Sequence, residues 1–286
     1  MEEQYKIIHP IKYYRNYIAH DIRPDGREFE AFRPIRINVK SIGTADGSAI
    51  VKLGNTTVIC GIKAELSAPT VEEPEKGYLI PNIDLTPLCS PKYRSNNTND
   101  DAQVLTCNLN NLIKEANWID LKNLCIAKER LVWTLYCDIT CVDYDGSILD
   151  ASVVAICAAL RSLTLPKVQY DDETNNYTVH KIDRSPLKLS EVCPVCTTAM
   201  IFDEKTVFAD PDAEEEELAT SLITIVTCNG EMCLVLKPDG VSISDRQFEA
   251  CLKLALNREK SICKLISSIV EENLKKKNNF CFKYIY

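Results

Sequence analysis

The 286-residue sequence is 45% hydrophobic and 26% charged, values typical of a soluble globular protein whose core is large enough for one or two domains. A net charge of −8 argues against a protein that coats nucleic acid broadly, although it leaves room for a local basic patch. The N-terminus, Met1-Glu-Glu-Gln-Tyr-Lys6, lacks the apolar stretch of a secretory signal, and no apolar run approaches the ~18 residues of a membrane span, so we expect no membrane partner.

The first part of the chain is dominated by strand patterns. Tyr and Ile at roughly helical spacing predict a short helix or arm within residues 5–20, and the Pro-Asp-Gly sequence in residues 22–27 predicts a turn. Apolar patterns then predict strands at residues 34–40, 49–53, 57–63 and 77–85. We expect residues 57–63 to form a central strand buried on both faces, and Pro81 to place its strand at a sheet edge or bulge.

Two helices and a long strand are predicted next. Apolar residues on one face predict a helix over residues 104–116, preceded by Asp100 and Asp101, which suit its N-terminus. Residues 132–142 form a long strand pattern. An alanine-rich helix is predicted over residues 149–163, and its small side chains would let it lie close to a sheet.

A polar, irregular stretch at residues 166–190 precedes a second half that repeats the pattern. Strands are predicted at residues 196–202, 206–209, 218–227 and 232–236, with an Asn229-Gly230 hairpin turn between the last two. Ser244 to Gln247 resemble a capping box that opens a long helix. Strands followed by helices, twice over, predict an α/β fold: a two-layer sandwich of two similar β-rich halves with packed helices.

We divide the chain into five segments on these patterns. They are an N-terminal arm (residues 1–28), a first half (29–165), a connecting segment (166–190), a second half (191–277) and a C-terminal tail (278–286).

Common signatures of metal, redox and nucleotide chemistry are incomplete in this sequence. Cys193-Pro-Val-Cys196 is a single pair where a structural zinc site needs four ligands, and it precedes a strand pattern rather than the helix of a redox motif. The sequence has only three histidines and lacks a phosphate-binding loop and a Gly-x-Ser-x-Gly motif. We therefore predict no metal and no cofactor, and interpret the 14 cysteines as reduced, mostly buried thiols of a cytosolic or nuclear protein.

The densest chemical feature is residues 210–217, Asp-Pro-Asp-Ala-Glu-Glu-Glu-Glu, in which six of eight residues are acidic. We call it the acid stretch. Acids gathered beside a strand could hold a metal or supply a general acid. A solvated turn is the alternative, and it is the commoner fate of a charge run.

Lys92 and Arg94, in Ser90-Pro-Lys-Tyr-Arg94, are the candidate RNA-binding residues. They lie on a predicted loop with an aromatic residue between them, as in contacts with single-stranded RNA. Two solvated loop cations are the alternative interpretation.

The order of several motifs resembles the RNase PH family over residues 22–275. These motifs are Arg23-Pro-Asp-Gly-Arg27, Ala45-Asp-Gly-Ser-Ala49 followed by Gly54-Asn-Thr-Thr-Val-Ile-Cys60, Asp143-Tyr-Asp-Gly-Ser-Ile-Leu-Asp150, and Asp210-Pro-Asp212 with its trailing acids. The resemblance implies the RNase PH fold (ribosomal protein S5 domain 2-like), and within the family it is greatest to ring subunits of the eukaryotic RNA exosome. Active family members are phosphorolytic 3′-to-5′ exoribonucleases, which cleave RNA from its 3′ end with inorganic phosphate as nucleophile.

The sequence departs from the active members at both parts of their site. Where they carry a Gly-Gly-Thr-Arg-like turn into a helix, this chain reads Gly146-Ser-Ile-Leu149, so Leu149 stands at the position of the phosphate-binding arginine. Asp210 and Asp212 match acids of the active members, Glu216 replaces an aspartate, and Leu222 stands in place of a further aspartate. The resemblance therefore implies that the chain has no catalytic residues.

We expect a catalytically inactive structural subunit of the exosome core ring. The partners implied are other RNase PH-like exosome ring subunits, S1/KH-type cap subunits, and single-stranded RNA threaded through the ring channel for 3′-to-5′ processing and decay of rRNA and mRNA. The implied location is the nucleus, nucleolus and cytoplasm. An active phosphate-dependent 3′-to-5′ exoribonuclease is the first alternative, and a free-standing RNA-binding monomer is the second.

Overall fold

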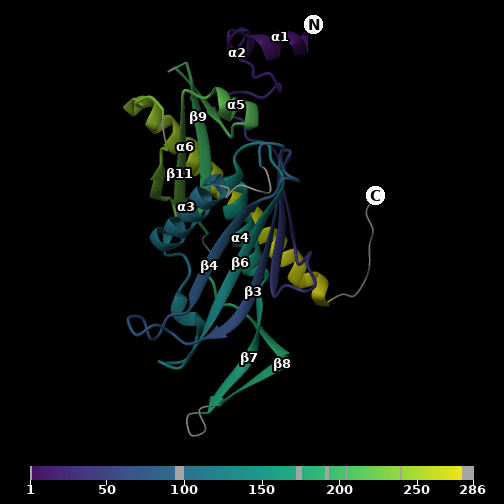
Figure 1. Cartoon of the computed structure of the whole chain (residues 1–286), viewed down its shortest axis with the longest axis vertical. Coiled ribbons are helices and arrows are strands. Elements are labelled where there is room, and N and C mark those ends of the chain that lie inside the picture. Colours follow the sequence, from purple (N-terminus) through teal and green to yellow (C-terminus); the bar gives the residue numbers. More distant parts are fainter. Residues whose placement is uncertain are drawn as a thin grey trace.

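A computed structural model of the chain describes residues 2–93, 100–171, 176–190, 193–203, 205–238 and 240–278. The first half forms a six-stranded sheet in which β3 and β6 are the long central strands (Figure 1). Its strands are β1 (Ile35–Val39), β2 (Gly47–Leu53), β3 (Thr56–Ser67), β4 (Tyr78–Leu85), β5 (Cys125–Ala127) and β6 (Leu131–Asp143). The order is β1-β2-β3-β6-β4, with β5 on β6. Within residues 29–165, the sequence pattern did not indicate the three-residue β5 or a neighbouring 3₁₀ turn, η1 (Leu121–Leu124), because both are short.

The central strand β3 corrects one prediction. Val58, Cys60 and Ile62 are fully buried, but Ile59 and Gly61 between them are partly exposed. Helix packing covers one face of β3, whereas the residues on its other face are partly exposed to solvent. The prediction that residues 57–63 are buried on both faces is therefore wrong. The prediction for Pro81 is confirmed, because β4 lies at the edge of the sheet and runs parallel to β6.

The second half forms a four-stranded antiparallel sheet in the order β10-β9-β11-β12. Its strands are β9 (Val195–Phe202), β10 (Thr206–Ala209), β11 (Ser221–Cys228) and β12 (Glu231–Leu236). The predicted hairpin turn is confirmed, since Asn229 and Gly230 both have positive φ, at 59° and 77°. A two-residue turn in which both residues have positive φ matches the right-handed twist of the two strands that it joins.

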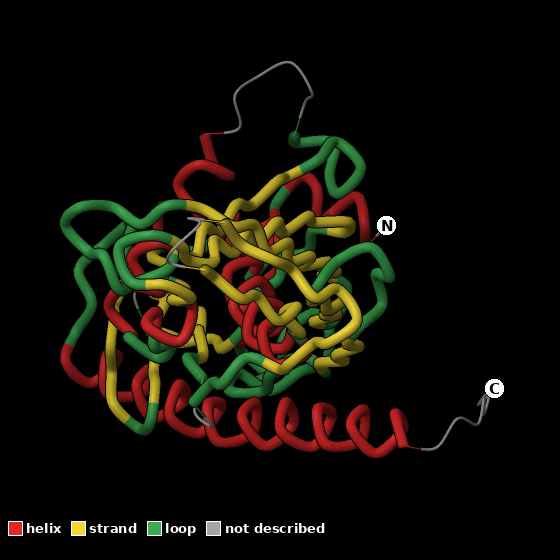
Figure 2. Tube along the Cα trace, turned by 90° about the horizontal axis from the view of Figure 1, so that it is seen from below, coloured by secondary structure: helices red, strands yellow, loops and turns green. Residues whose placement is uncertain are grey.

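Three long helices cover and separate the sheets: α3 (Asp100–Ala116), α4 (Ile148–Ser162) and α6 (Asp245–Asn278). Helix α4 packs on β2, β3 and β9, and every residue in it except Arg161 is buried. Gly47 of β2 permits a close approach of the helix, because a Cβ on this residue would lie 2.8 Å from the carbonyl oxygen of Ala159. Helix α6 lies along β9 and β11, and Figure 2 shows it running along one side of the molecule.

The N-terminal segment forms two short helices, α1 (Glu2–Ile8) and α2 (Pro10–Ile18), where one helix or arm is predicted. Both lie at the end of the molecule that carries α5 (Ala213–Leu218) (Figure 1). Tyr14 is 2% exposed and packs with Phe202 and Phe208 of the second sheet. The arm is therefore anchored to the second half of the chain.

The connecting segment corrects a second prediction. Residues 166–190 are predicted to be irregular, but most of them form a two-stranded antiparallel ribbon of β7 (Thr164–Asp171) and β8 (Asn176–Pro186) that projects from the body (Figure 1). Val168 faces Val179 and Tyr170 faces Tyr177 across it. Such cross-strand pairs stabilise a ribbon whose polar composition hides the strand pattern.

No helix among the described residues is long and apolar enough to cross a membrane. The 13 cysteines in the same residues are free thiols, and most of them are buried, as predicted.

Candidate functional site

The acid stretch lies against the turn between β6 and α4. Ser147 links the two segments twice: its hydroxyl donates to the carbonyl oxygen of Pro211 at 3.0 Å, and its backbone N–H donates to Oε1 of Glu216 at 2.7 Å. Gly146 permits this approach, since a Cβ there would lie 2.6 Å from backbone atoms of the acid stretch. The structure thus brings together two segments that the family resemblance places in one site.

Asp210 is fully buried and bound by Arg33. The Arg33 guanidinium donates to Asp210 from Nε at 3.1 Å and from Nη2 at 2.7 Å, and the Arg33 backbone N–H adds a bond of 2.8 Å. Burial acts to raise the pKa of Asp210, but the contacts with Arg33 outweigh it and leave that pKa below its ordinary value. The carboxyl group is therefore an ionised partner of Arg33, which does not suit a proton donor.

Glu215 is held in the same way by Arg23. The pair is 0% and 1% exposed, and Arg23 Nε donates to Oε1 of Glu215 at 2.9 Å while Nη2 contacts Oε2. A third bond of 2.8 Å runs from Arg23 to the carbonyl oxygen of Ala209. Arg27 reaches the backbone carbonyl of Asp210 at 3.0 Å. Both arginines of the Arg23-Pro-Asp-Gly-Arg27 motif therefore fix the acid stretch in place.

Glu216 lies at the N-terminus of α4. Its carboxylate accepts the Ser147 backbone N–H at 2.7 Å and the Tyr144 hydroxyl at 2.8 Å. Burial raises the pKa of Glu216 above its ordinary value, although both hydrogen bonds oppose the shift. A helix N-terminus is a natural site for an anion, and here the anion is a side chain of the chain itself.

Asp212 caps the short helix α5. Its Oδ1 accepts the Glu215 backbone N–H at 2.8 Å, and Glu215 Oε2 accepts the Asp212 backbone N–H at 3.0 Å, which completes a capping box. Burial, with the nearby Glu215 charge, raises the pKa of Asp212 to about 6. Within the acid stretch, Asp212 therefore serves as a helix cap, and residues 213–218 form the helix that it caps.

The raised pKa of Asp212 predicts a pH-dependent effect of Asp212→Asn. The unfolded carboxyl group loses its proton near pH 3.8 and the folded one near pH 6, so its ionisation costs stability as the pH rises through that window. Asparagine is an equally good cap and carries no charge. We expect the variant to gain on the order of 1 kcal/mol in free energy of unfolding at neutral pH, after allowance for solvent screening, and nothing below about pH 4. Urea unfolding at both pH values measures this.

Asp203→Asn is the control with the opposite sign. Its hydrogen bond with Arg15 lowers the pKa of Asp203, so ionised Asp203 stabilises the fold above its ordinary pKa and loses that effect as the pH falls. The asparagine variant should therefore be slightly less stable than the natural protein at neutral pH. A loss of stability in Asp212→Asn at neutral pH would show that this carboxylate is needed as an anion.

A cavity of about 690 Å³ opens beside these residues, between α3, the start of α4 and the end of β12. We call it the α3–α4 cavity. It brings together Leu149, Leu222 and Glu216, which stand at positions where the resemblance places catalytic groups of active members. Its lining residues are Lys92, Tyr93, Asp101, Val104, Leu105, Asn108, Tyr144, Ser147, Ile148, Leu149, Thr198, Glu216, Leu222, Thr224, Val235, Leu236, Lys237 and Pro238.

Of the two candidate RNA-binding residues, the structure places one. Lys92 is exposed at the cavity, with its Nζ 3.9 Å from Oδ2 of Asp101 and 5.8 Å from the centre of the Tyr93 ring. Arg94 lies outside the described residues. Lys237 is a second exposed cation on the cavity that the sequence patterns did not single out, since it follows a predicted strand by one residue.

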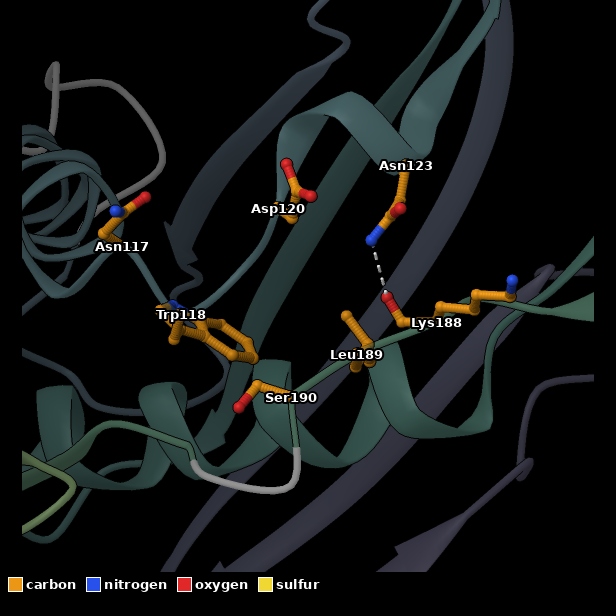
Figure 3. Close-up of a pocket in the computed structure, with 7 residues that line it drawn as sticks. All are labelled: Asn117, Trp118, Asp120, Asn123, Lys188, Leu189 and Ser190. Atoms are coloured by element: carbon orange, nitrogen blue, oxygen red, sulfur yellow. Dashed lines mark hydrogen bonds between the residues drawn. The ribbon is translucent and has the colours of Figure 1, made fainter.

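A second cavity of about 440 Å³ lies between the end of α3, η1 and residues 188–190 (Figure 3). Asn123 crosses part of it to donate to the Lys188 carbonyl oxygen at 3.3 Å. None of its lining residues belongs to the acid stretch or the α3–α4 cavity. We therefore keep the α3–α4 cavity as the candidate site.

The cysteine pair of Cys193-Pro-Val-Cys196 is divided by the fold. Both side chains are buried, but Cys193 interacts with the thiols of Cys157 on α4 and Cys263 on α6, and its Sγ lies 3.6 Å from that of Cys263. In the part of the chain that the structure describes, no group of three His, Cys, Asp or Glu side chains is placed to share a metal ion.

Sequence reasoning missed the arginines that neutralise the acids. Arg23 is 192 residues from Glu215 and Arg33 is 177 residues from Asp210, so no local pattern could pair them. The capping box was the signal available for α5, because an Asp followed three residues later by a Glu matches the sequence signature of a helix N-terminus.

Family models match both halves of the chain. Residues 31–166 match the model of the "3' exoribonuclease family, domain 1", and residues 193–258 match "domain 2" of the same family. The exosome complex component rrp43 of Schizosaccharomyces pombe is 35% identical over 255 residues, which cover 89% of this chain and 94% of that one. The exosome complex component Rrp42 of Methanothermobacter thermautotrophicus is 35% identical over 216 residues, 75% of this chain and 78% of that one.

Solved structures match the fold over most of its length. An Archaeoglobus fulgidus exosome with RNA bound to the active site contains a chain that superposes with a TM-score of 0.79 at 28% identity, covering 89% of this chain and 96% of that one. A chain of an archaeal exosome core gives a TM-score of 0.77 at 27% identity, with coverage of 93% and 100%. The predicted RNase PH fold is confirmed, and so is the predicted resemblance to exosome subunits, since the rrp43 relative is an exosome subunit of the ribosomal RNA-processing protein 43 type. With both domain models matched in order and the relatives aligned along most of its length, the chain belongs to the 3′ exoribonuclease family, whose fold is that of RNase PH.

Proposed function

We propose that this chain is a catalytically inactive structural subunit of the RNA exosome core ring. Similarity to exosome components along most of the chain supports a place in that assembly. The observation that carries the proposal of inactivity is the contact between Glu216 and the Ser147 backbone N–H, because a carboxylate already sits where α4 would receive a phosphate. An incoming phosphate would meet its negative charge.

The remaining site chemistry points the same way. Leu149 offers no cation to a phosphate, and Leu222 can neither carry a proton nor bind a metal. Asp210 is committed to Arg33, and Asp212 caps α5. Phosphorolysis needs a held phosphate and a group that acts on the leaving oxygen, and this geometry supports neither role.

In the proposed role the subunit helps form the channel that guides single-stranded RNA for 3′-to-5′ processing and decay of rRNA and mRNA. Its partners are other RNase PH-like ring subunits and S1/KH-type cap subunits, in the nucleus, nucleolus and cytoplasm. Lys92 and Arg94 contact the RNA at the channel rim. The net charge of −8 suits a surface used mainly for protein partners, with RNA restricted to a small region.

Incubation of the purified chain with 3′-labelled single-stranded RNA and inorganic phosphate tests the inactivity. We expect no nucleoside diphosphate above the level of a phosphate-free control. Release of nucleoside diphosphate that Asp210→Asn or Asp212→Asn abolishes would instead establish the alternative, an active phosphate-dependent exoribonuclease. Co-purification with ring subunits, followed by sedimentation, tests the structural role, and a stable monomer that binds RNA without partners would contradict it.

A further inference from the structure

The α3–α4 cavity has the size and accessibility of a ligand site. Its volume of about 690 Å³ falls within the ~300–1,000 Å³ typical of pockets for small molecules and cofactors. Lys92 and Lys237 are exposed at its mouth, whereas Ile148 and Leu149 are 7% and 6% exposed and lie at its inner end. The cavity therefore has a charged outer part and an apolar inner part.

The inner part is unsuited to a phosphate. Among the described lining residues, the cations are Lys92 and Lys237, both at the mouth. The group that faces the start of α4 is the carboxylate of Glu216. An anion that entered this far would lose its water and meet a like charge.

The inner part does suit a flat, uncharged ring. Leu149, Leu222 and Val235 supply apolar surface. Tyr93 and Tyr144 line the same cavity, with ring centres 5.6 Å apart at an angle of 88°. Asn108 and Thr224 add polar groups that can donate and accept hydrogen bonds at the edge of such a ring. Apolar and aromatic surface with a few polar groups is the composition that recognises a nucleobase.

We infer that the α3–α4 cavity binds one nucleobase of a single-stranded RNA, with the adjoining phosphate held outside it by Lys92 and Lys237. Both ammonium groups lie on the exposed surface, where Lys92 Nζ is 3.9 Å from Asp101 Oδ2 and Lys237 Nζ donates to the Gly240 carbonyl oxygen at 3.1 Å. The site has thus exchanged phosphate recognition for base recognition. The inference rests on the proposed function for the identity of the ligand as RNA.

Competition between ligands distinguishes base recognition from phosphate recognition. A single-stranded RNA carrying 5-iodouridine is crosslinked by light to the full-length chain, alone and in the assembled ring, and the crosslinked peptides are identified by mass spectrometry. We expect crosslinks at Tyr93 or Tyr144, and we expect uridine or adenosine monophosphate to suppress them at concentrations where inorganic phosphate does not. Equal suppression by inorganic phosphate would overturn the inference.

Variants that fill the cavity with a larger side chain provide a second test of the inference. Val235→Trp should reduce the crosslinking at least tenfold, whereas Val241→Trp, the same change at an exposed site outside the cavity, should leave it unchanged. If Val235→Trp does not fold, Lys92→Glu with Lys237→Glu changes only exposed side chains and should weaken RNA binding at least tenfold. Crosslinks that persist in the folded variants, or that map elsewhere, would overturn the inference while ring assembly and inactivity still stood. Phosphorolysis by the purified chain would instead contradict the proposed function.

Discussion

Arg23→Ala is expected to lower the free energy of unfolding by about 3 kcal/mol, the lower end of the ~3–5 kcal/mol usual for breaking a buried ion pair, because Arg27 Nη2 remains 3.6 Å from Glu215 Oε2. Arg23 and Glu215 are 0% and 1% exposed, so water cannot replace the lost guanidinium. The carbonyl oxygen of Ala209 would also lose its donor. Urea unfolding of the full-length chain, followed by circular dichroism, measures the change.

Two further variants isolate the cause. Arg15→Ala removes an exposed arginine from a pair with Asp203, whose side chains are 57% and 39% exposed, and should cost much less stability, because exposed ion pairs contribute little. Arg23→Met combined with Glu215→Leu removes both buried charges and should recover most of the loss, because no unpaired charge remains. If Arg23→Ala were as mild as Arg15→Ala, the buried pair would not be what holds the acid stretch.

These ion pairs indicate a structural role for the acid stretch. Asp210 and Glu215 are each neutralised by an arginine, Asp212 caps a helix, and Glu216 occupies the N-terminus of α4. These four acids therefore bind other groups of the same chain and stabilise its fold. The family resemblance implies that Leu149 and Leu222 stand in place of charged groups, and in the structure both leucines line the α3–α4 cavity, where they supply apolar surface.

Local physics explains which parts of the fold the sequence could predict. Alternation of apolar residues indicated the strands of both sheets, and the alanines of α4 indicated a helix close to a sheet, since both patterns depend on neighbours along the chain. The ribbon β7–β8 was missed because the described residues of β8 are exposed and β7 is only partly covered on one face, so neither strand carries the fully buried face that enforces apolar alternation. The partial exposure of one face of β3 was not predicted, because Ile59 on that face is apolar, as a buried residue would be, yet only partly covered.

The order of the motifs could predict which segments of the chain meet at the site, but not which side chains bind one another there. The resemblance placed residues 143–150 and 210–217 in one site, and the structure brings them together through Ser147. It could not indicate that Arg23 and Arg33 would bind the acids, because those partners lie more than 170 residues away along the chain. Nor could it show that Glu216 turns back onto the helix N-terminus, which depends on the orientation of α5.

Gly146→Ala should be the most damaging small substitution at this site, with a loss of about 3 kcal/mol in free energy of unfolding. Gly146 has φ of +74°, a conformation that alanine adopts at a cost of about 1 kcal/mol. The added Cβ would also lie 2.6 Å from the carbonyl carbon of Asp212 and from the carbonyl oxygen of Pro211. Backbone atoms cannot turn aside as a flexible side chain can, so the clash should add roughly 2 kcal/mol.

Gly230→Ala separates the cost of the positive φ from the cost of the steric clash. Gly230 has a nearly equal φ of +77°, but no heavy atom lies within 4 Å of the Cβ that alanine would add. It should therefore lose only about 1 kcal/mol, and the difference between the two variants measures the contact between the turn and the acid stretch. Equal losses would mean that this contact is loose. The bond from Ser147 to Glu216 depends on the same contact, so the argument that Glu216 excludes a phosphate from α4 would then lose its geometric basis.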